Sequence, residues 1–257
     1  MGWFFDVHGI VYFMKNIETE VCVTSVAGAI HAQNVCADRV EVCTALQVGG
    51  LTPSAGLIEG VRRAFDGEVV VLVRPRPGDF AVTSAELGTM CQEIEHARDL
   101  GADGVAVGAL TPQGQVDEAA MAALVASASS LNVTFHRAID SVKDPCEALG
   151  VLRGLGVARV LTSGGEKTAM EGIDGLAQLV AAAGDTPCIV AAAGIRSKNV
   201  RELIRRSGVS QVHFSASQGV KTTMNESVPW VLSEDRATMD HVDADPEELI
   251  AMMAQLR

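Results

Sequence analysis

From Glu20 onward, two kinds of segment repeat along the chain. A short run rich in Val, Ile, Leu and Cys leads into a polar loop, which is followed by an Ala-rich segment with apolar residues every three or four positions. The first pattern is typical of a buried strand and the second of an amphipathic helix. Each strand and helix pattern together is followed by residues, often glycine, that end a helix. The regular recurrence of this unit predicts a series of βα units.

The pattern predicts eight strands, at 20–25, 39–45, 69–75, 104–110, 133–139, 159–165, 188–194 and 211–217. It predicts helices at 26–36, 54–66, 84–99, 117–129, 144–154, 168–183, 198–207 and 246–256. Eight βα units in 257 residues predict a TIM (β/α)8 barrel, a single domain over residues 20–257. An open doubly wound sheet is the alternative, but the first loop lacks the glycine-rich turn usual in such sheets.

Two segments do not follow this rhythm. Residues 1–19 form an N-terminal extension that is apolar and aromatic at first but carries Asp6 and His8, without a basic leader or a small-residue cleavage site. It therefore predicts neither a signal peptide nor a membrane span. We interpret it as a plug for the bottom of the barrel, or as residues upstream of a natural start at Met14. Residues 218–243 are polar and predicted to be irregular, as a lid, a surface excursion or a subunit contact.

Composition and charge exclude several classes of partner. Hydrophobic residues make up 48% of the chain, which suits helices packed on a buried parallel sheet. The formal net charge of −12 disfavours nucleic acid and anionic membrane surfaces as partners. The six cysteines lack CxxC or zinc-type spacing, so we interpret them as reduced thiols and expect a cytoplasmic protein.

Polar side chains cluster where the predicted strands end. The stretch from Val133 to Asp140 begins as an apolar strand and then supplies His136, Arg137 and Asp140. The loops that follow the strands of a closed barrel meet on one face, so we expect these groups to share a site. Other members are Glu41 and Cys43 on the second strand, Arg74, Arg76 and Asp79 after the third, and His213 and Ser215 on the eighth.

Glu41 and His136 are the candidate catalytic residues. Val40 and Val42 share one face of their strand, so Glu41 and Cys43 should point into the barrel. A buried carboxylate needs a partner, which an arginine of the third strand or His136 would supply, with pKa shifts suited to acid–base chemistry. His136 should face Glu41, and regular strand geometry should stop at about His136. The alternatives are a buried ion pair without a chemical role and a structural core histidine.

A pocket for a small anion is a second prediction. Its candidate residues are Arg74, Arg76, Ser163, Gly164, Gly165 and Gly194. Arginine binds carboxylate or phosphate in a bidentate fashion, and the prolines beside these arginines restrict them. Glycines before a helix expose backbone N–H groups to an anion. The alternative is that the arginines neutralise Glu41 or Asp79 and the glycines only form tight turns.

Cys22 and Cys43 are the candidate metal ligands. They lie at similar depths on neighbouring predicted strands, and two inward thiols suit a soft monovalent ion such as Cu(I). The alternative is that two small side chains merely fill the barrel core.

The blocks VCVTS, DRVEVCTAL, GGLTPSAGLI, VRPRPGDF, VTFHRAID, RVLTSGG and VHFSAS, in this order, resemble the copper homeostasis protein CutC family. The resemblance runs from about Glu20 to Ser217. It implies a cytoplasmic TIM barrel that forms homo-oligomers, acts in intracellular copper handling and binds Cu(I) through Cys22 and Cys43. The chain departs from the family pattern at Thr24 and Val48, where acidic residues are usual, and at 191–193, where three alanines replace a glycine-rich strand end.

Two functions therefore stay open. One is a copper homeostasis protein that binds Cu(I). The other is an enzyme in which Glu41 and His136 perform acid–base chemistry on a small anionic substrate, sugar-like or phosphorylated. The copper homeostasis protein is the main prediction and the enzyme is the alternative, for which the best argument is that the ionisable groups at the strand ends exceed what a two-thiol copper site requires.

Overall fold

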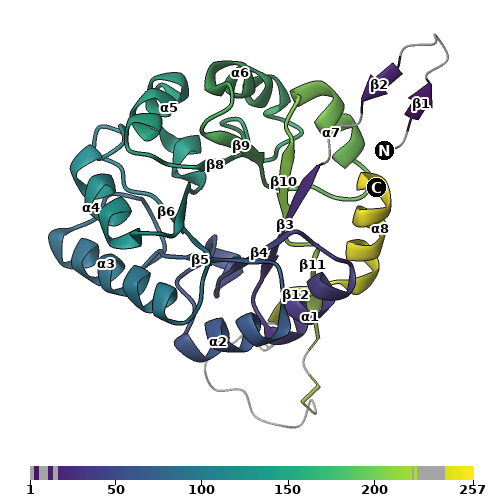
Figure 1. The fold of residues 1–257 in the computed structure, drawn as a ribbon, viewed down its shortest axis with the longest axis horizontal. Helices are drawn as coiled ribbons and strands as arrows, with labels where there is room; N and C mark the ends of the chain where they lie inside the picture. The colour runs from purple at the N-terminus through teal and green to yellow at the C-terminus, as the bar shows by residue number, and fades with distance from the viewer. Residues whose placement is uncertain (1–2, 6–10, 14–16, 222, 225–240) are drawn as a thin grey trace.

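The computed structural model describes residues 3–5, 11–13, 17–221, 223–224 and 241–257. Its barrel strands are β3 (Glu18–Val23), β4 (Arg39–Val42), β5 (Glu68–Leu72), β6 (Gly104–Val107), β7 (Asn132–Phe135), β8 (Arg159–Thr162), β9 (Cys188–Ala191) and β10 (Gln211–Phe214). All pairings between neighbours are parallel, and β10 pairs with β3 to close the ring (Figure 1). The TIM barrel is confirmed, and closure of the ring excludes the open doubly wound sheet.

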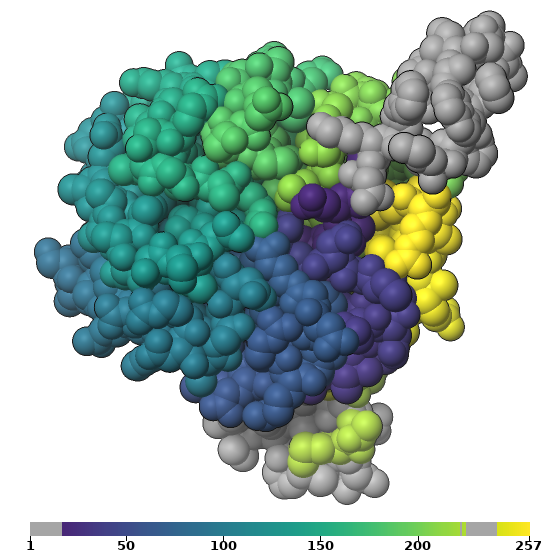
Figure 2. Space-filling model, in the orientation of Figure 1, coloured from purple at the N-terminus to yellow at the C-terminus, as the bar shows by residue number. Residues whose placement is uncertain are grey.

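Helices surround the barrel in sequence order (Figure 1). They are α1 (Val26–Asn34), α2 (Ala55–Ala64), α3 (Ser84–Asp99), α4 (Glu118–Ala128), α5 (Pro145–Gly154), α6 (Ile173–Ala183), α7 (Val200–Ser207) and α8 (Pro246–Leu256). Side-chain caps fix several of their starts, as where Asp144 accepts the N–H of Glu147. In the space-filling view the colours run around the molecule, and α8 lies against α1 (Figure 2).

The alternation of side chains along the strands separates a main hydrophobic core from two smaller apolar clusters. Val40 and Val42 face the helices and belong to the main hydrophobic core. Cys22, Cys43 and Leu72 instead form a smaller apolar cluster, together with Val70 and Ala106. The inward orientation expected for Cys43 is therefore observed, because successive residues of a strand point to opposite faces.

All eight barrel strands end earlier than the sequence pattern predicts. The strand expected at 133–139 stops at Phe135, because Nδ1 of His136 accepts the N–H of Ala138 and starts a 3-10 turn at Arg137–Ser141. The end of the strand at His136 is thus as expected. Helix α6 begins at Ile173 rather than at 168, because residues before it form a tight turn: a Cβ atom on Gly164 would lie 2.1 Å from the carbonyl oxygen of Gly172.

Two short antiparallel pairs accompany the barrel. Strands β1 (Trp3–Phe5) and β2 (Val11–Phe13) pair with each other and are drawn outside the ring of helices (Figure 1), while Met14 lies outside the described residues. Strands β11 (Ser217–Val220) and β12 (His241–Ala244) also pair. The expectation that 218–243 is wholly irregular is therefore wrong at both ends, and residues 222 and 225–240 lie outside the description. None of the described helices is long and apolar enough to cross a membrane.

Candidate functional site

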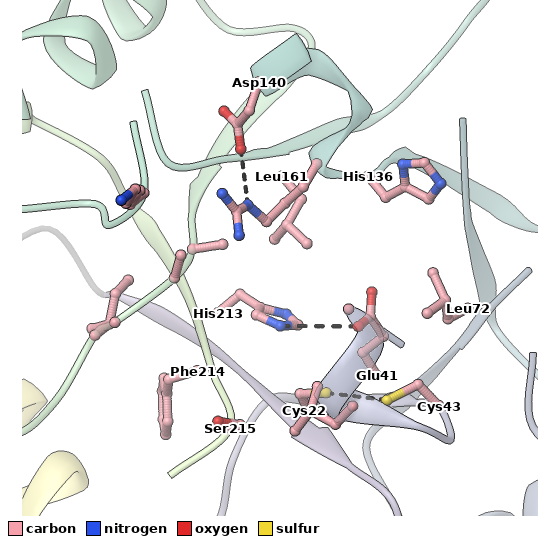
Figure 3. A pocket seen from close by; sticks show the side chains of 18 of the residues that line it. Cys22, Glu41, Cys43, Leu72, His136, Asp140, Leu161, His213, Phe214 and Ser215 are labelled. Carbon is pink, nitrogen blue, oxygen red and sulfur yellow. Dashed lines mark hydrogen bonds and ion pairs between the residues drawn. The ribbon is translucent and has the colours of Figure 1, made fainter. Parts of the chain in front are cut away.

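A cavity of about 670 Å³ lies at the carboxyl ends of the barrel strands. Its wall includes Cys22 from β3, Glu41 from β4, and His213 from β10, with Cys43 and His136 from positions that directly follow β4 and β7 (Figure 3). Residues far apart in the sequence thus meet on one face of the barrel, as the polar strand ends predict. The candidate metal ligands and candidate catalytic residues share a single cavity.

His213 lies between two buried carboxylates. Its Nδ1 atom is 2.6 Å from Oε1 of Glu20. On its other side, Nε2 is 3.9 Å from Oε2 of Glu41 (Figure 3). The partner of Glu41 is therefore His213. The expected partners, His136 or an arginine after the third strand, form no ion pair with Glu41 among the described residues.

Burial and mutual charge shift the pKa of all three groups. Burial raises the pKa of Glu41 to about 7, against the opposing charge of His213. Burial would lower the pKa of His213, but Glu41 and Glu20 outweigh it and raise that pKa. Burial likewise works against ionisation of Glu20, yet the hydrogen bond and charge of His213 hold its pKa at about 2. Glu20 thus remains a carboxylate, the protonated form of His213 is favoured, and Glu41 is suited to proton transfer near neutral pH.

A layer of charged and polar side chains lies beneath this pair, near the amino ends of the strands. Arg39 is bonded to Glu20 and donates to Gln211 at 2.9 Å. It also pairs with Glu68 at 3.3 Å, and Glu68 accepts from Arg159 at 2.7 Å. Arg39 is only 2% exposed, so its charge depends on these partners.

The two candidate thiols are in contact. Sγ of Cys22 lies 3.4 Å from Sγ of Cys43, and both side chains are buried. The hydrogen bond to Cys43, followed by burial, raises the pKa of the Cys22 thiol. The sulfur of Cys22 also lies near a carboxylate oxygen of Glu41 and a ring nitrogen of His213, and these three atoms are all within 4.8 Å of one another. The cavity thus offers sulfur, oxygen and nitrogen ligands to a metal ion.

His136 has a largely structural environment. Its ring centroid lies 5.0 Å from that of Phe80, and Nδ1 accepts from the N–H of Ala138 at 3.2 Å. The absence of a side chain at Gly108 makes room for the ring, since a Cβ atom there would lie 2.4 Å from Cε1 of His136. Burial, followed by the charge of Arg74, lowers the pKa of His136 to about 3. The imidazole is therefore neutral at neutral pH.

The two arginines after the third barrel strand have different roles. Arg74 lines the cavity, but its guanidinium donates to the carbonyl oxygens of Val48, Gly50 and Gly78 and lies 5.1 Å from the centre of the Phe80 ring. It holds the loops around the site together.

Arg76 does not line the cavity. Its Nε atom donates to Glu86 at 2.5 Å, and Nη2 donates to Asp79 at 3.0 Å. The structure therefore separates Arg76 from the other candidate anion-binding residues, in line with the alternative that it neutralises Asp79.

The glycine loop after β8 binds a carboxylate of the protein itself. Asp140 accepts the hydroxyl of Thr162 at 2.5 Å and the backbone N–H groups of Ser163 and Gly165 at 3.1 and 3.2 Å. Its other oxygen accepts from Nε of Arg137 at 2.8 Å. The N–H groups expected to receive an external anion are thus occupied by Asp140.

Of the two remaining anion candidates, Gly164 is bonded within the protein and Gly194 lines the cavity. The N–H of Gly164 donates to Thr162 at 2.9 Å, so it is also used internally. Gly194 lines the cavity beside Arg196, and Lys167 lines it from the β8 loop. Positive charge at the cavity wall therefore comes from the candidate Arg74 and also from Arg137, Lys167 and Arg196, which were not among the candidate anion-binding residues.

Two central residues were missed by the sequence analysis. His213 was noted only as a polar residue of the eighth strand, and Glu20 was not considered. Strand alternation contains the missing signal, because Glu20 shares its face with Cys22, and β10 pairs directly with β3. Their meeting became visible only once closure of the barrel placed the last strand beside the first.

Comparison with known proteins agrees with this architecture. The model of the CutC family matches residues 17–218. A family protein CutC from Xylella fastidiosa is 42% identical over 237 residues, which cover 92% of this chain and 88% of the relative. One from Klebsiella pneumoniae strain 342 is 45% identical over 212 residues, 82% of this chain and 85% of the relative.

Solved structures also include a CutC protein among those similar to this chain. The crystal structure of CutC from Streptococcus agalactiae, described as a candidate copper homeostasis protein, has a TM-score of 0.73 and 29% identity, covering 77% of this chain and 98% of that one. Thiamine phosphate pyrophosphorylase from Pyrococcus furiosus, with a TM-score of 0.56 and 14% identity, shares the fold alone. The match over most of the length, at up to 45% identity in these relatives, confirms the family resemblance. The chain belongs to the CutC family.

Proposed function

We propose that this CutC-family protein acts in copper homeostasis by binding Cu(I) in the cytoplasm through Cys22 and Cys43. The observation that carries the proposal is the 3.4 Å contact between the two sulfur atoms in the wall of an accessible cavity. Thiolate is the ligand that soft Cu(I) prefers over harder oxygen groups. The description of the Streptococcus agalactiae relative supports the same role.

The surroundings of the thiols suit a soft ion. Val70, Leu72 and Ala106 pack against the two cysteines and leave few competing oxygen ligands on that side. A two-coordinate ion sits between its sulfur ligands, so the cysteine side chains move apart from their present contact when Cu(I) enters. The raised pKa of Cys22 means that binding displaces a proton from the thiol.

The state of the cysteines supports a reducing compartment. All six are unpaired, including the two whose sulfur atoms touch.

A homo-oligomer is proposed on separate grounds: Ile30 of α1 and Ile250 of α8 are exposed apolar side chains on contacting helices, at 46% and 62% exposure. Light scattering of the wild type and Ile250→Lys tests the oligomer, which should dissociate in the variant.

An anaerobic competition with a Cu(I) chelator tests the copper site. The wild type should bind one Cu(I) per chain, and Cys22→Ser or Cys43→Ser should lower the affinity by orders of magnitude, because a hydroxyl is a poor ligand for a soft ion. Cys36→Ser and Cys146→Ser are matched controls at exposed thiols and should bind as the wild type does. Equal affinity in all five proteins removes this site from consideration.

A second function, acid–base catalysis on a small anionic substrate, is favoured by the size of the cavity. A volume of about 670 Å³ greatly exceeds that of one ion and lies in the usual range for organic ligands. Arg137, Lys167 and Arg196 line it together with Glu41 and His213, so they would hold the anion while this pair moves protons. Phosphorylated sugars and carboxylates should raise the melting temperature of the wild type and not of Arg196→Ala. An equal rise in both proteins argues against this arrangement.

A further inference from the structure

We infer that Cys22, Glu41 and His213 form a second metal site, for a divalent cation of borderline softness such as Zn²⁺. One ligand atom from each residue lies within 4.8 Å of the other two. The residues come from β3, β4 and β10, which are consecutive strands of the barrel, and all three line the cavity (Figure 3). The site differs from the two-thiol site in its ligands and in the ion that it selects.

The ligand types point to a borderline ion. Zn²⁺ is bound in proteins by cysteine sulfur, histidine nitrogen and carboxylate oxygen, whereas a carboxylate suits Cu(I) poorly. Glu41 and His213 together would therefore favour Zn²⁺. Cys43, although it touches Cys22, is not part of the three-residue set.

His213 is oriented in the manner of a metal-binding histidine. Oε2 of Glu20 is bonded to the Arg39 guanidinium, and its other oxygen, Oε1, is left as an acceptor, so Nδ1 of His213 donates to it across the 2.6 Å contact. Nε2 is then the atom that faces Glu41 and the cavity. Histidines that bind metals almost always donate their second ring N–H to a carboxylate or carbonyl group, which fixes both the tautomer and the ring. Glu20, held in turn by Arg39, has this role here.

The distances are close to those of a tetrahedral ion. Bond lengths of about 2.0–2.3 Å place neighbouring ligand atoms about 3.3–3.8 Å apart. Nε2 of His213 and Oε2 of Glu41 are already 3.9 Å apart, and the remaining separations do not exceed 4.8 Å. Small side-chain adjustments therefore suffice to bring all three atoms onto one ion.

Three protein ligands leave one position free. In catalytic zinc sites that position holds a water molecule or the substrate, and the ion lowers the pKa of the water. Here it would face a cavity large enough for an organic molecule. The inferred site thus gives the barrel a Lewis acid at the end of its strands where barrel enzymes carry out chemistry.

Cobalt substitution provides the direct test. Co²⁺ bound at this site should produce the intense near-ultraviolet absorption of a thiolate–Co²⁺ bond, and Cys22→Ser should abolish that absorption. The Zn²⁺ affinity, measured by competition with a chromophoric chelator, should fall more than about 100-fold in Glu41→Gln and His213→Gln, beyond the usual effect of losing an outer-sphere partner. Circular dichroism and thermal unfolding establish that each variant is folded.

The variants also distinguish this site from the proposed copper site. Cys43→Ser should lose Cu(I) affinity and keep Zn²⁺ affinity, whereas Glu41→Gln should keep Cu(I) affinity and lose Zn²⁺ affinity. Cys22→Ser should lose both. The inference is overturned if wild-type protein with Co²⁺ lacks the thiolate absorption, a result that requires no variant to fold. Unchanged Zn²⁺ affinity in folded Glu41→Gln overturns it as well, whatever the outcome for Cu(I).

Discussion

His213 and Glu20 are joined by a contact of 2.6 Å between Nδ1 and Oε1. They lie on β10 and β3, the last and first strands of the barrel, which pair with each other to close the ring. Glu20 does not line the cavity, and neither does Arg39, to which it is bonded. The two residues nevertheless determine which ring nitrogen of His213 faces a ligand. The chemistry of the cavity therefore depends on side chains that a ligand never touches.

Glu20→Gln should weaken both the fold and the metal site. Removing one member of a buried ion pair costs up to about 3–5 kcal/mol, because Arg39 loses its buried partner and keeps only the more exposed carboxylate of Glu68, at 3.3 Å, to balance its charge. Loss of the carboxylate behind His213 should also lower Zn²⁺ affinity about 10–100-fold. Urea unfolding and chelator competition measure the two effects. Glu18→Gln is the matched control: its side chain, on the same strand, is 49% exposed, and it should change stability by no more than about 0.5 kcal/mol. Similar losses in both variants would contradict the assigned role of Glu20.

His136 should make stability depend on pH. The folded protein lowers its pKa from 6.5 to about 3, so between these values the unfolded chain binds a proton that the folded chain does not. Protonation of His136 in the unfolded chain therefore lowers the free energy of unfolding as the pH falls from about 6.5 towards 3. Other groups titrate in the same range. The informative quantity is therefore the free energy of unfolding of the wild type minus that of His136→Asn, measured by urea unfolding at several pH values.

That difference should shrink as the solution becomes more acidic. His96→Asn removes an exposed histidine and serves as the control for the loss of a surface imidazole. A difference for His136→Asn that is constant across the pH range would mean that His136 is not held neutral by its surroundings.

Asp140→Ala should convert the glycine loop after β8 into a site for external anions. The variant leaves the N–H groups of Ser163 and Gly165 without their acceptor and should be less stable. Formate or acetate should then raise its melting temperature, because a ligand that binds only the folded state stabilises it. Asp79→Ala is the matched control, since Asp79 also pairs with an arginine three residues earlier, at 3.0 Å, but accepts a single backbone N–H. A carboxylate response of equal size in both variants and the wild type would refute the interpretation of the loop.

Gly108→Ala should destabilise the protein by about 1–3 kcal/mol, the usual cost of overpacking a core. The new Cβ atom would lie 2.4 Å from the ring of His136 and 3.1 Å from Cβ of Ala138, so the histidine must move. Gly150→Ala is the control within α5, where nothing lies within 4 Å of the added atom. It should stabilise the helix by up to about 1 kcal/mol, since alanine has the higher helix propensity. Thermal unfolding of the two variants would disprove the packing argument if both shifts had the same sign.

The sequence predicts those features of the site that depend on strand alternation. Val40 and Val42 mark the outer face of β4, so the inward position of Cys43 followed directly, and its contact with Cys22 required only that consecutive strands be neighbours. Eight repeats likewise sufficed to predict the barrel, because parallel strands joined by helices have few ways to close.

The sequence does not predict how the loops fold back on the strands. Arg74 and Arg76 are two residues apart, yet three loop carbonyls hold the first at the cavity while Asp79 and Glu86 hold the second away from it. Asp140 was a recognisable strand-end residue, but nothing local indicated that it would occupy the N–H groups around Ser163. Such pairings depend on tertiary contacts between different loops, for which local pattern carries no signal.

The charged and polar residues around Arg39 fill the barrel at the amino ends of its strands, whereas the cavity lies at the carboxyl ends. Arg39, Glu20 and Gln211 are buried at the amino ends of the strands, where their hydrogen bonds block the axis from that side. A cation bound at Cys22, as proposed, would therefore enter and leave from the carboxyl ends of the strands, where the cavity lies. An organic molecule that occupies the outer part of the cavity covers the ion beneath it, so the two should exchange in a fixed order: the ion enters first and leaves last.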